Sequence, residues 1–293
     1  MKSGFILIDK PEGISSFDVI RKLRKVSGIK KMGHAGTLDP FATGLMIIAL
    51  NNATRLLRFF DASQKTYIAG LCFGSQTDTG DITGEVTKRD NIIPNINIKT
   101  VEKQIKLIKS QTPSKYSAIK INGKKAYELA RKDIDFEMKE RKISILAFHI
   151  HTYKYPELYY ECTVSSGTYI RTLSEQIADL LNTIAYTKTL RRTAIDDISV
   201  NQAVALDVLN EENWHEHLLS YDSLFPEFQH FSIAKKDQHL YFNGVRLEKS
   251  RFNLLKRTEK PESFIFDEDS QCIGLSIAQD NQLIPMVIFN DKK

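Results

Sequence analysis

The densest group of residues that could do chemistry lies in residues 33–44, which read Gly-His-Ala-Gly-Thr-Leu-Asp-Pro-Phe-Ala-Thr-Gly. The three glycines permit positive φ angles and close backbone approach, and Pro40 favours an extended backbone at Asp39. We therefore expect a rigid loop that presents one carboxylate, a group that can serve as a nucleophile or a general base. An Asp-Pro pair by itself is more simply a turn, so the rest of the chain must decide between these two interpretations.

The cysteines and histidines predict neither a disulfide framework nor a metal site. The cysteines lie roughly a hundred residues apart with no CxxC pair, at Cys72, Cys162 and Cys272. This spacing predicts reduced, buried thiols rather than a disulfide framework or a thiolate zinc site. The alternating pairs His149/His151 and His215/His217 lack the additional ligands that a metal ion requires. We expect neither a metal nor a cofactor.

The segments around the loop predict the elements that hold it. Residues 5–8 read as a short buried strand. Ser15 and Asp18 resemble a capping box, and apolar residues at helical spacing continue until Gly28, which together predict one amphipathic helix. Further strands are expected at residues 46–50 and 66–73.

The remaining segments favour an α+β fold. A helix is predicted at residues 100–109, a β pair at 143–153 and 158–165, and a helix at 171–182. Strands and helices follow one another without regular βαβ spacing, which favours a mixed sheet over a doubly wound one. The acidic stretch at residues 196–227 is expected to link helices. Short strands that indicate a small β-barrel module then follow at residues 245–248, 263–267, 273–278 and 283–289.

Composition and charge narrow the class of protein. The chain has 293 residues, of which 42% are hydrophobic, so it can bury a core. Residues 103–132 hold nine Lys or Arg against one acid, whereas residues 196–230 hold eight acids and no Lys or Arg. A basic region of this kind fits a phosphate backbone, and solvated lysine-rich helices explain it about as well. No apolar run approaches the ~20 residues of a membrane span and no secretory signal begins the chain, so we expect a cytoplasmic protein.

Residues 33–44 closely resemble the catalytic motif of the bacterial tRNA pseudouridine synthase B family, which isomerises the T-loop uridine at tRNA position 55. Further motifs of that family follow in the same order: Leu7-Ile8-Asp9-Lys10-Pro11, Lys65-Thr66-Tyr67, Thr77-Asp78-Thr79 with Asp81 and Gly84, and Gly167-Thr168-Tyr169-Ile170-Arg171. The implied reaction moves a base on its sugar without a redox step, which agrees with the expected lack of a metal and a cofactor.

The resemblance assigns three catalytic residues. Asp39 is the essential carboxylate, and Arg171 pairs with it and keeps it ionised. Tyr67 is expected to stack on the flipped uracil, with its hydroxyl available for proton transfer at C5. Whether Asp39 attacks the sugar, attacks the base or removes a ribose proton stays open.

Weaker assignments concern substrate binding. His34 is expected to fill the space that the flipped base leaves, with a structural histidine as the alternative. Tyr169 is expected to line the pocket, and Lys10 to brace either the loop or the substrate.

Residues 111–133 resemble the family's insertion that closes over RNA. Its basic residues, including Lys120, Lys124 and Arg131, alternate with tyrosines. That mixture suits a segment that grips phosphates, and a solvated basic helix is the alternative.

The resemblance also implies an architecture and a partner. Residues 1–228 are expected to form the pseudouridine synthase fold, a mixed and mainly antiparallel sheet with flanking helices, and residues 229–293 a PUA-like module. The implied partner is the T-arm stem-loop of tRNA, bound by a monomer that needs no protein partner and no membrane.

Two other functions remain open at this stage. A non-catalytic RNA binder or folding helper would carry the same surface. A hydrolase of glycosidic bonds would use two carboxylates ~5–10 Å apart, and no second acid stands out beside Asp39 in the motifs.

Overall fold

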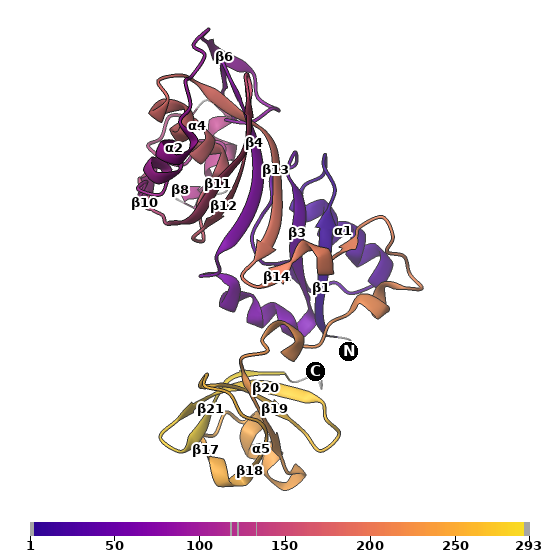
Figure 1. The fold of residues 1–293 in the computed structure, drawn as a ribbon. Coiled ribbons are helices and arrows are strands. Elements are labelled where there is room, and N and C mark those ends of the chain that lie inside the picture. Colours follow the sequence, from indigo (N-terminus) through magenta and orange to yellow (C-terminus); the bar gives the residue numbers. More distant parts are fainter. Residues whose placement is uncertain (1–2, 118, 122, 133, 290–293) are drawn as a thin grey trace.

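The computed structural model describes residues 3–289 except 118, 122 and 133, and it is built on two large sheets (Figure 1). The larger sheet has, in spatial order, β11 (Ile145–Lys154), β12 (Glu157–Val164), β4 (Lys65–Phe73), β13 (Ala185–Ile195), β3 (Thr43–Leu50), β1 (Gly4–Lys10) and β15 (Val204–Ala205), with β14 (Ile198–Ser199) beside β13 and β2 (Met32–His34) beside β3. Its strands are antiparallel except for the pairs β13–β3 and β1–β15. The predicted α+β fold with a mixed, mainly antiparallel sheet is confirmed.

The helices pack on the two sheets or connect their strands. They are α1 (Ser16–Ser27), α2 (Ile98–Ile105), α3 (Ala126–Ala130), α4 (Ile170–Leu180) and α5 (Lys235–Phe242), with 3-10 helices η1 (Asn51–Phe60), η2 (Val200–Gln202), η3 (Trp214–His217), η4 (Asp222–Leu224) and η5 (Lys249–Arg251). Helix α1 has the predicted capping box between Ser15 and Asp18, and it ends at Gly28 in the left-handed conformation, with φ of 69°. No helix in the described part of the chain has the length and apolar character to cross a membrane.

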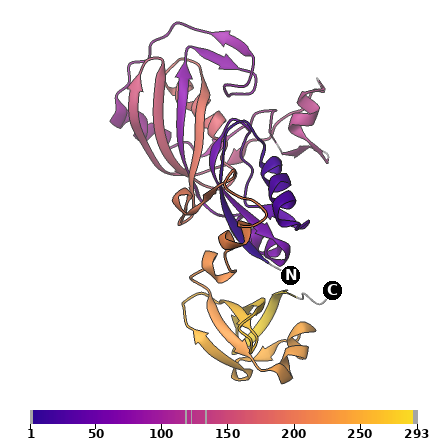
Figure 2. The same ribbon diagram turned by 90° about the vertical axis from the view of Figure 1, so that its right-hand side faces the viewer.

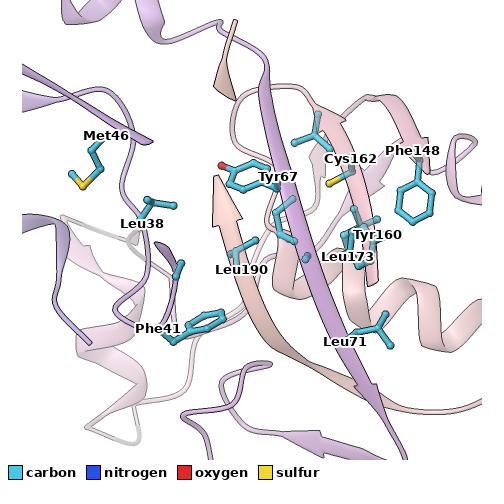
Figure 3. Close-up of a cluster of buried hydrophobic side chains, with 14 of the residues drawn as sticks. Leu38, Phe41, Met46, Tyr67, Leu71, Phe148, Tyr160, Cys162, Leu173 and Leu190 are labelled. Carbon is cyan, nitrogen blue, oxygen red and sulfur yellow. The ribbon is translucent and has the colours of Figure 1, made fainter. Parts of the chain in front are cut away.

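At β1 both faces of the larger sheet are covered, as the alternation of its side chains illustrates. Ile6 and Ile8 point into one core cluster, which also contains side chains of α1, α4 and β4. Phe5 and Leu7 point into the other, which η1 covers. Figure 3 shows part of the first cluster, where the side chains of β4, β12 and β13 meet.

The smaller sheet belongs to the C-terminal segment and lies at the other end of the molecule (Figure 1). Its strands, in spatial order, are β17 (Leu247–Glu248), β21 (Gln282–Ile288), β20 (Cys272–Gln279), β19 (Glu262–Phe266), β16 (Gln229–Ile233) and β18 (Phe252–Lys256). This curled sheet with α5 fits the predicted PUA-like module.

The segment that resembles the RNA-closing insertion projects from the larger sheet (Figure 2). It contains the hairpin of β8 (Lys120–Ile121) and β9 (Lys124–Lys125) and helix α3, and the pair of β7 (Ser110–Gln111) and β10 (Arg141–Lys142) lies at its base. A further hairpin of β5 (Ser75–Thr77) and β6 (Val86–Arg89) stands at the top in Figure 1. Residues 118, 122 and 133 of the predicted insertion and the outer ends of both predicted domain ranges lie outside the described residues.

Several expected elements differ from those in the structure. The acidic residues 196–227 were expected to link helices, which is wrong, because they run from β13 to β16 through β14, β15 and 3-10 turns. The helix expected at 100–109 begins at Ile98 and ends at Ile105, since the chain then turns toward β7. Strand β13, which pairs with both β4 and β3, was not predicted at all.

Candidate active site

The loop that carries Asp39 is anchored to the N-terminal end of α1. The Ser16 hydroxyl donates to the Leu38 carbonyl and accepts from the Leu38 backbone N–H, at 2.9 and 2.8 Å. The Gly13 backbone N–H donates to the Pro40 carbonyl at 2.8 Å. These bonds hold the backbone on both sides of Asp39, so the carboxylate projects from a fixed position.

Lys10 lies beneath this loop with no exposed surface. Its ammonium donates to the carbonyls of Pro11, Ile14 and Pro40 at 2.9, 2.8 and 3.2 Å. Burial lowers the pKa of Lys10 to about 8, so the group stays charged at neutral pH. All three N–H donors of the ammonium are used, and the side chain does not line the pocket. Of the two roles predicted for Lys10, these contacts fit support of the loop and do not fit contact with the substrate.

Arg171 reaches Asp39 from the first turn of α4. Its Nε lies 3.0 Å from Asp39 Oδ2, and its Nη2 lies 3.5 Å from Asp39 Oδ1. The guanidinium also donates to the carbonyls of Thr79 and Tyr116, at 2.7 and 3.1 Å. Its side chain is only 5% exposed, whereas that of Asp39 is 36% exposed. A buried, fully anchored cation therefore holds a carboxylate that still reaches the cavity.

Two opposing effects set the charge state of Asp39. Burial raises its pKa above the ordinary value, and the Arg171 guanidinium acts against this increase. The negative charge of Asp81 adds to the increase, and Lys10 opposes it weakly. Arg171 therefore favours the ionised form of the Asp39 carboxylate, which burial disfavours.

Asp81 is a second carboxylate on Arg171, and the sequence did not connect the two. Its Oδ2 lies 3.4 Å from Arg171 Nη1, and its side chain is 5% exposed. Its other oxygen accepts from the Thr79 hydroxyl and from the backbone and hydroxyl of Thr83, at 3.0, 2.9 and 2.6 Å. Asp81 does not line the cavity, so it positions Arg171 and is out of reach of a bound molecule.

The cavity beside Asp39 has a volume of about 390 Å³, which falls within the usual range of small-ligand sites. The predicted residues that line it are His34, Asp39, Tyr67, Tyr169 and Arg171. Three of the predicted binding residues, Lys120, Lys124 and Arg131, are exposed on the insertion and do not reach it.

Tyr67 lies on β4 with its ring buried at 7% exposure. Its hydroxyl points toward the side of Leu38 and away from Cys162 (Figure 3). Burial raises the pKa of Tyr67, so the hydroxyl remains protonated at neutral pH.

Arg192, which the sequence analysis missed, lies next to Tyr67. The two residues are directly opposite on β13 and β4. The Arg192 side chain is buried, lines the cavity and donates to the carbonyls of Leu45 and Gly36 at 2.7 and 3.1 Å. Its charge lowers the pKa of Tyr67, which burial raises. At His34 the charge of Arg192 and burial both lower the pKa. No local pattern singles out this arginine, because its role depends on strand pairing.

The segment before Arg171 is held by a side chain of the insertion. Gln111 is buried, accepts from the Tyr169 backbone N–H at 3.0 Å and donates to the Tyr169 carbonyl at 3.1 Å. It also donates to Gln176 on α4 at 3.1 Å. Since Tyr169 caps α4 without a side-chain bond of its own, Gln111 fixes the start of the helix that carries Arg171.

The described residues contain no group of three or more His, Cys, Asp or Glu side chains that could hold a metal ion. The titratable and charged side chains that line the cavity are His34, Asp39, Asp61, Lys65, Tyr67, Tyr169, Arg171 and Arg192.

Comparison with known proteins identifies the family. Residues 24–170 match the family model described as TruB family pseudouridylate synthase, N-terminal domain. A protein of Aquifex aeolicus named tRNA pseudouridine synthase B is 36% identical over 96% of this chain and 98% of its own length. One of Endomicrobium trichonymphae with the same name is 41% identical over 69% of this chain and 88% of its own length.

Solved structures agree on the fold. A chain in the crystal structure of a Cbf5-Nop10-Gar1 complex superposes with a TM-score of 0.69 at 20% identity, over 98% of this chain and 85% of that chain. At that identity the likeness concerns the fold alone. Together with a family model that matches half of the sequence and a relative aligned over nearly its full length, it leads to one conclusion: the chain belongs to the TruB family of pseudouridylate synthases.

Proposed function

We propose that the protein is a tRNA pseudouridine synthase that converts the T-loop uridine at tRNA position 55 into pseudouridine. The observation that carries the proposal is the pair of Asp39 and Arg171 at the wall of a cavity that Tyr67 shares. The relatives named tRNA pseudouridine synthase B support the choice of tRNA as substrate.

The reaction requires one bond to break and one to form. The bond from C1′ to N1 of the uracil breaks, the base turns while it is held, and C1′ joins C5. The proton of C5 leaves to solvent and N1 gains a proton, so no atom of the nucleoside is lost. Attack by Asp39 on the sugar, attack on the base, or removal of a ribose proton all need the ionised carboxylate that Arg171 supports. Late in the reaction the Tyr67 oxygen takes up the proton of C5 while its own hydroxyl proton passes to solvent.

The uridine has to leave its folded loop before it can enter the cavity, which costs a few kcal/mol. Tyr67 compensates part of this cost by stacking on the flipped base. His34 and Tyr169, at the wall of the same cavity, are suited to fill the vacated space and to line the pocket.

Residues outside the cavity bind the rest of the RNA. Lys120, Lys124 and Arg131 of the insertion contact phosphates of the T-arm, and their exposure supports that role. The protein recognises the folded arm largely by shape, since side chains cannot read the deep major groove of A-form RNA.

We propose that residues 1–228 form the catalytic domain and that residues 229–293 form a PUA-like domain. We also propose that the protein acts as a monomer. The proposed tRNA substrate supports a cytoplasmic location.

The test is incubation with a T-arm stem-loop RNA that carries tritium at C5 of the target uridine, followed by nucleoside analysis. We expect tritium release together with one pseudouridine per RNA. Free uracil would instead indicate a glycosidic hydrolase, and tight binding without either product would indicate a folding helper. Either result would refute the proposal.

A further inference from the structure

At the rim of the cavity lies an arginine without an acceptor. Arg141 lies on β10, at the base of the insertion, and its Nε is buried with no hydrogen-bond partner in the described part of the chain. Among the described residues no ion pair or hydrogen bond reaches the rest of its guanidinium either. Buried donors normally have partners because an unmade hydrogen bond costs free energy, so an acceptor brought by a ligand would complete this site.

The backbone fixes the guanidinium against the segment that forms the cavity wall. Ser144 and Ser165 join the two segments, since the Ser144 N–H donates to the Ser165 hydroxyl and the Ser165 N–H donates to the Ser144 carbonyl, both at 2.9 Å. Two residues further on, Gly167 has a φ of 78° and no side chain. A Cβ at Gly167 would lie 2.2 Å from Arg141 Nη2, so the guanidinium occupies the space that a side chain there would fill.

We propose that Arg141 binds a backbone phosphate of the RNA next to the nucleotide that enters the cavity, an inference that rests on the proposed function. Gly167 lines the cavity and Arg141, which packs against it, does not, so Arg141 lies beside the cavity and would meet the sugar-phosphate backbone rather than the base. The planar fork of arginine matches two phosphate oxygens, and charge-assisted bonds of this kind are among the strongest.

The experiment compares Arg141→Gln with Lys142→Gln, its exposed neighbour on the same strand, so that both variants lose one positive charge. Each protein is tested for affinity and for tritium release with three T-arm RNAs. One RNA is unmodified, and the other two carry an uncharged methylphosphonate at the phosphate on the 5′ or the 3′ side of the target uridine.

For unmodified RNA we expect Arg141→Gln to weaken binding by about 10- to 100-fold, and Lys142→Gln by less than about threefold. One of the two methylphosphonates should weaken binding to the wild type by a similar factor. The same methylphosphonate should have no further effect on Arg141→Gln, because the partner of that phosphate is already gone.

Three results would overturn the inference. They are binding by Arg141→Gln within about threefold of the wild type, an equal loss in Lys142→Gln, or a methylphosphonate penalty that persists in Arg141→Gln. Thermal unfolding checks the fold of each variant. If Arg141→Gln is unstable, the uncharged Arg141→Met replaces it, and an undiminished methylphosphonate penalty in that variant contradicts the contact. Binding without tritium release in the wild type would refute the proposed function. The inference about Arg141 would then still be tested by the RNA affinities of the wild type and the variants.

Discussion

At the scale of single residues, the charge of Asp39 depends on two neighbours with opposite effects. Burial and Asp81 raise its pKa, and Arg171 lowers it. The reaction needs the ionised carboxylate, so activity should fall as pH decreases through that raised pKa. The acidic limb of kcat/KM reports this pKa in the free enzyme.

Substitution of the two neighbours should therefore shift the acidic limb in opposite directions. Asp81→Asn removes a negative charge, which lowers the pKa of Asp39 and moves the limb to lower pH. Arg171→Met removes the stabilising cation and moves the limb to higher pH. Both variants should also lose rate at the plateau, because Arg171 is misplaced or absent. The measurement is kcat/KM against pH for both variants and the wild type, and a shift in the same direction in both would contradict this electrostatic account.

The sequence predicted the central residues of the site but not the residues that position them. Asp39, Tyr67 and Arg171 were predicted by resemblance to family motifs, and the structure places them around one cavity. The contact between Asp81 and Arg171 joins residues 90 positions apart, so no local spacing indicates it. Arg192 depends in the same way on the pairing of β13 with β4.

At the scale of elements, the loop that holds Asp39 depends on a lysine that carries no exposed surface. The three carbonyls that accept from Lys10 lie in the turn before α1 and in the loop itself. Removal of the ammonium takes this donor from the carbonyls of Pro11 and Ile14, whereas the Pro40 carbonyl still accepts from the Gly13 N–H. Each buried acceptor left without a donor costs about 1–3 kcal/mol.

Lys10→Met keeps an unbranched side chain of nearly the same length and removes the hydrogen bonds. We expect the free energy of unfolding to fall by about 2 kcal/mol or more, and kcat/KM to fall because the loop is released. The exposed Lys31→Met is the control and should stay within about 0.5 kcal/mol of the wild type. Urea unfolding of the three proteins gives the comparison, and equal stabilities would show that Lys10 does not brace the loop.

Local signals explain which elements were predictable. The capping box and Gly28 define α1 within the sequence itself, and the apolar residues of β1 and β4 mark them as strands. Strand β13 reads Ala-Tyr-Thr-Lys-Thr-Leu-Arg-Arg-Thr-Ala-Ile, and its buried positions include Thr187 and Arg192. Because this strand passes the active site, some of its inward-facing side chains are polar. The alternation of apolar and polar residues that predicts a strand is therefore missing.

At the scale of the whole molecule, a single aromatic cluster joins the two sheets. Phe225 lies in the connecting segment, and its ring is 5.2 Å from that of Phe60 on η1 and 6.2 Å from that of Phe264 on β19. The same core cluster contains Phe5 from β1 and Val287 from β21. The C-terminal sheet therefore shares a core with the part that holds the cavity.

Phe225→Ala should destabilise both parts together. Loss of a buried phenylalanine costs about 3–5 kcal/mol, and here the lost contacts come from both sheets. We expect the wild type to unfold in one transition and the variant to unfold earlier. Circular dichroism and the fluorescence of Trp214, which reports the larger sheet, follow the unfolding. An unchanged Trp214 transition in the variant would show that the sheets are independent.

The central claim is that one carboxylate, held by Arg171, performs the isomerisation. The most direct measurement is single-turnover tritium release from the T-arm RNA by Asp39→Asn, with Asp61→Asn as the control because Asp61 lines the same cavity. The account predicts no detectable release by Asp39→Asn with RNA affinity retained, and release by Asp61→Asn within a few-fold of the wild type. Release by Asp39→Asn at a rate close to that of the wild type would contradict it.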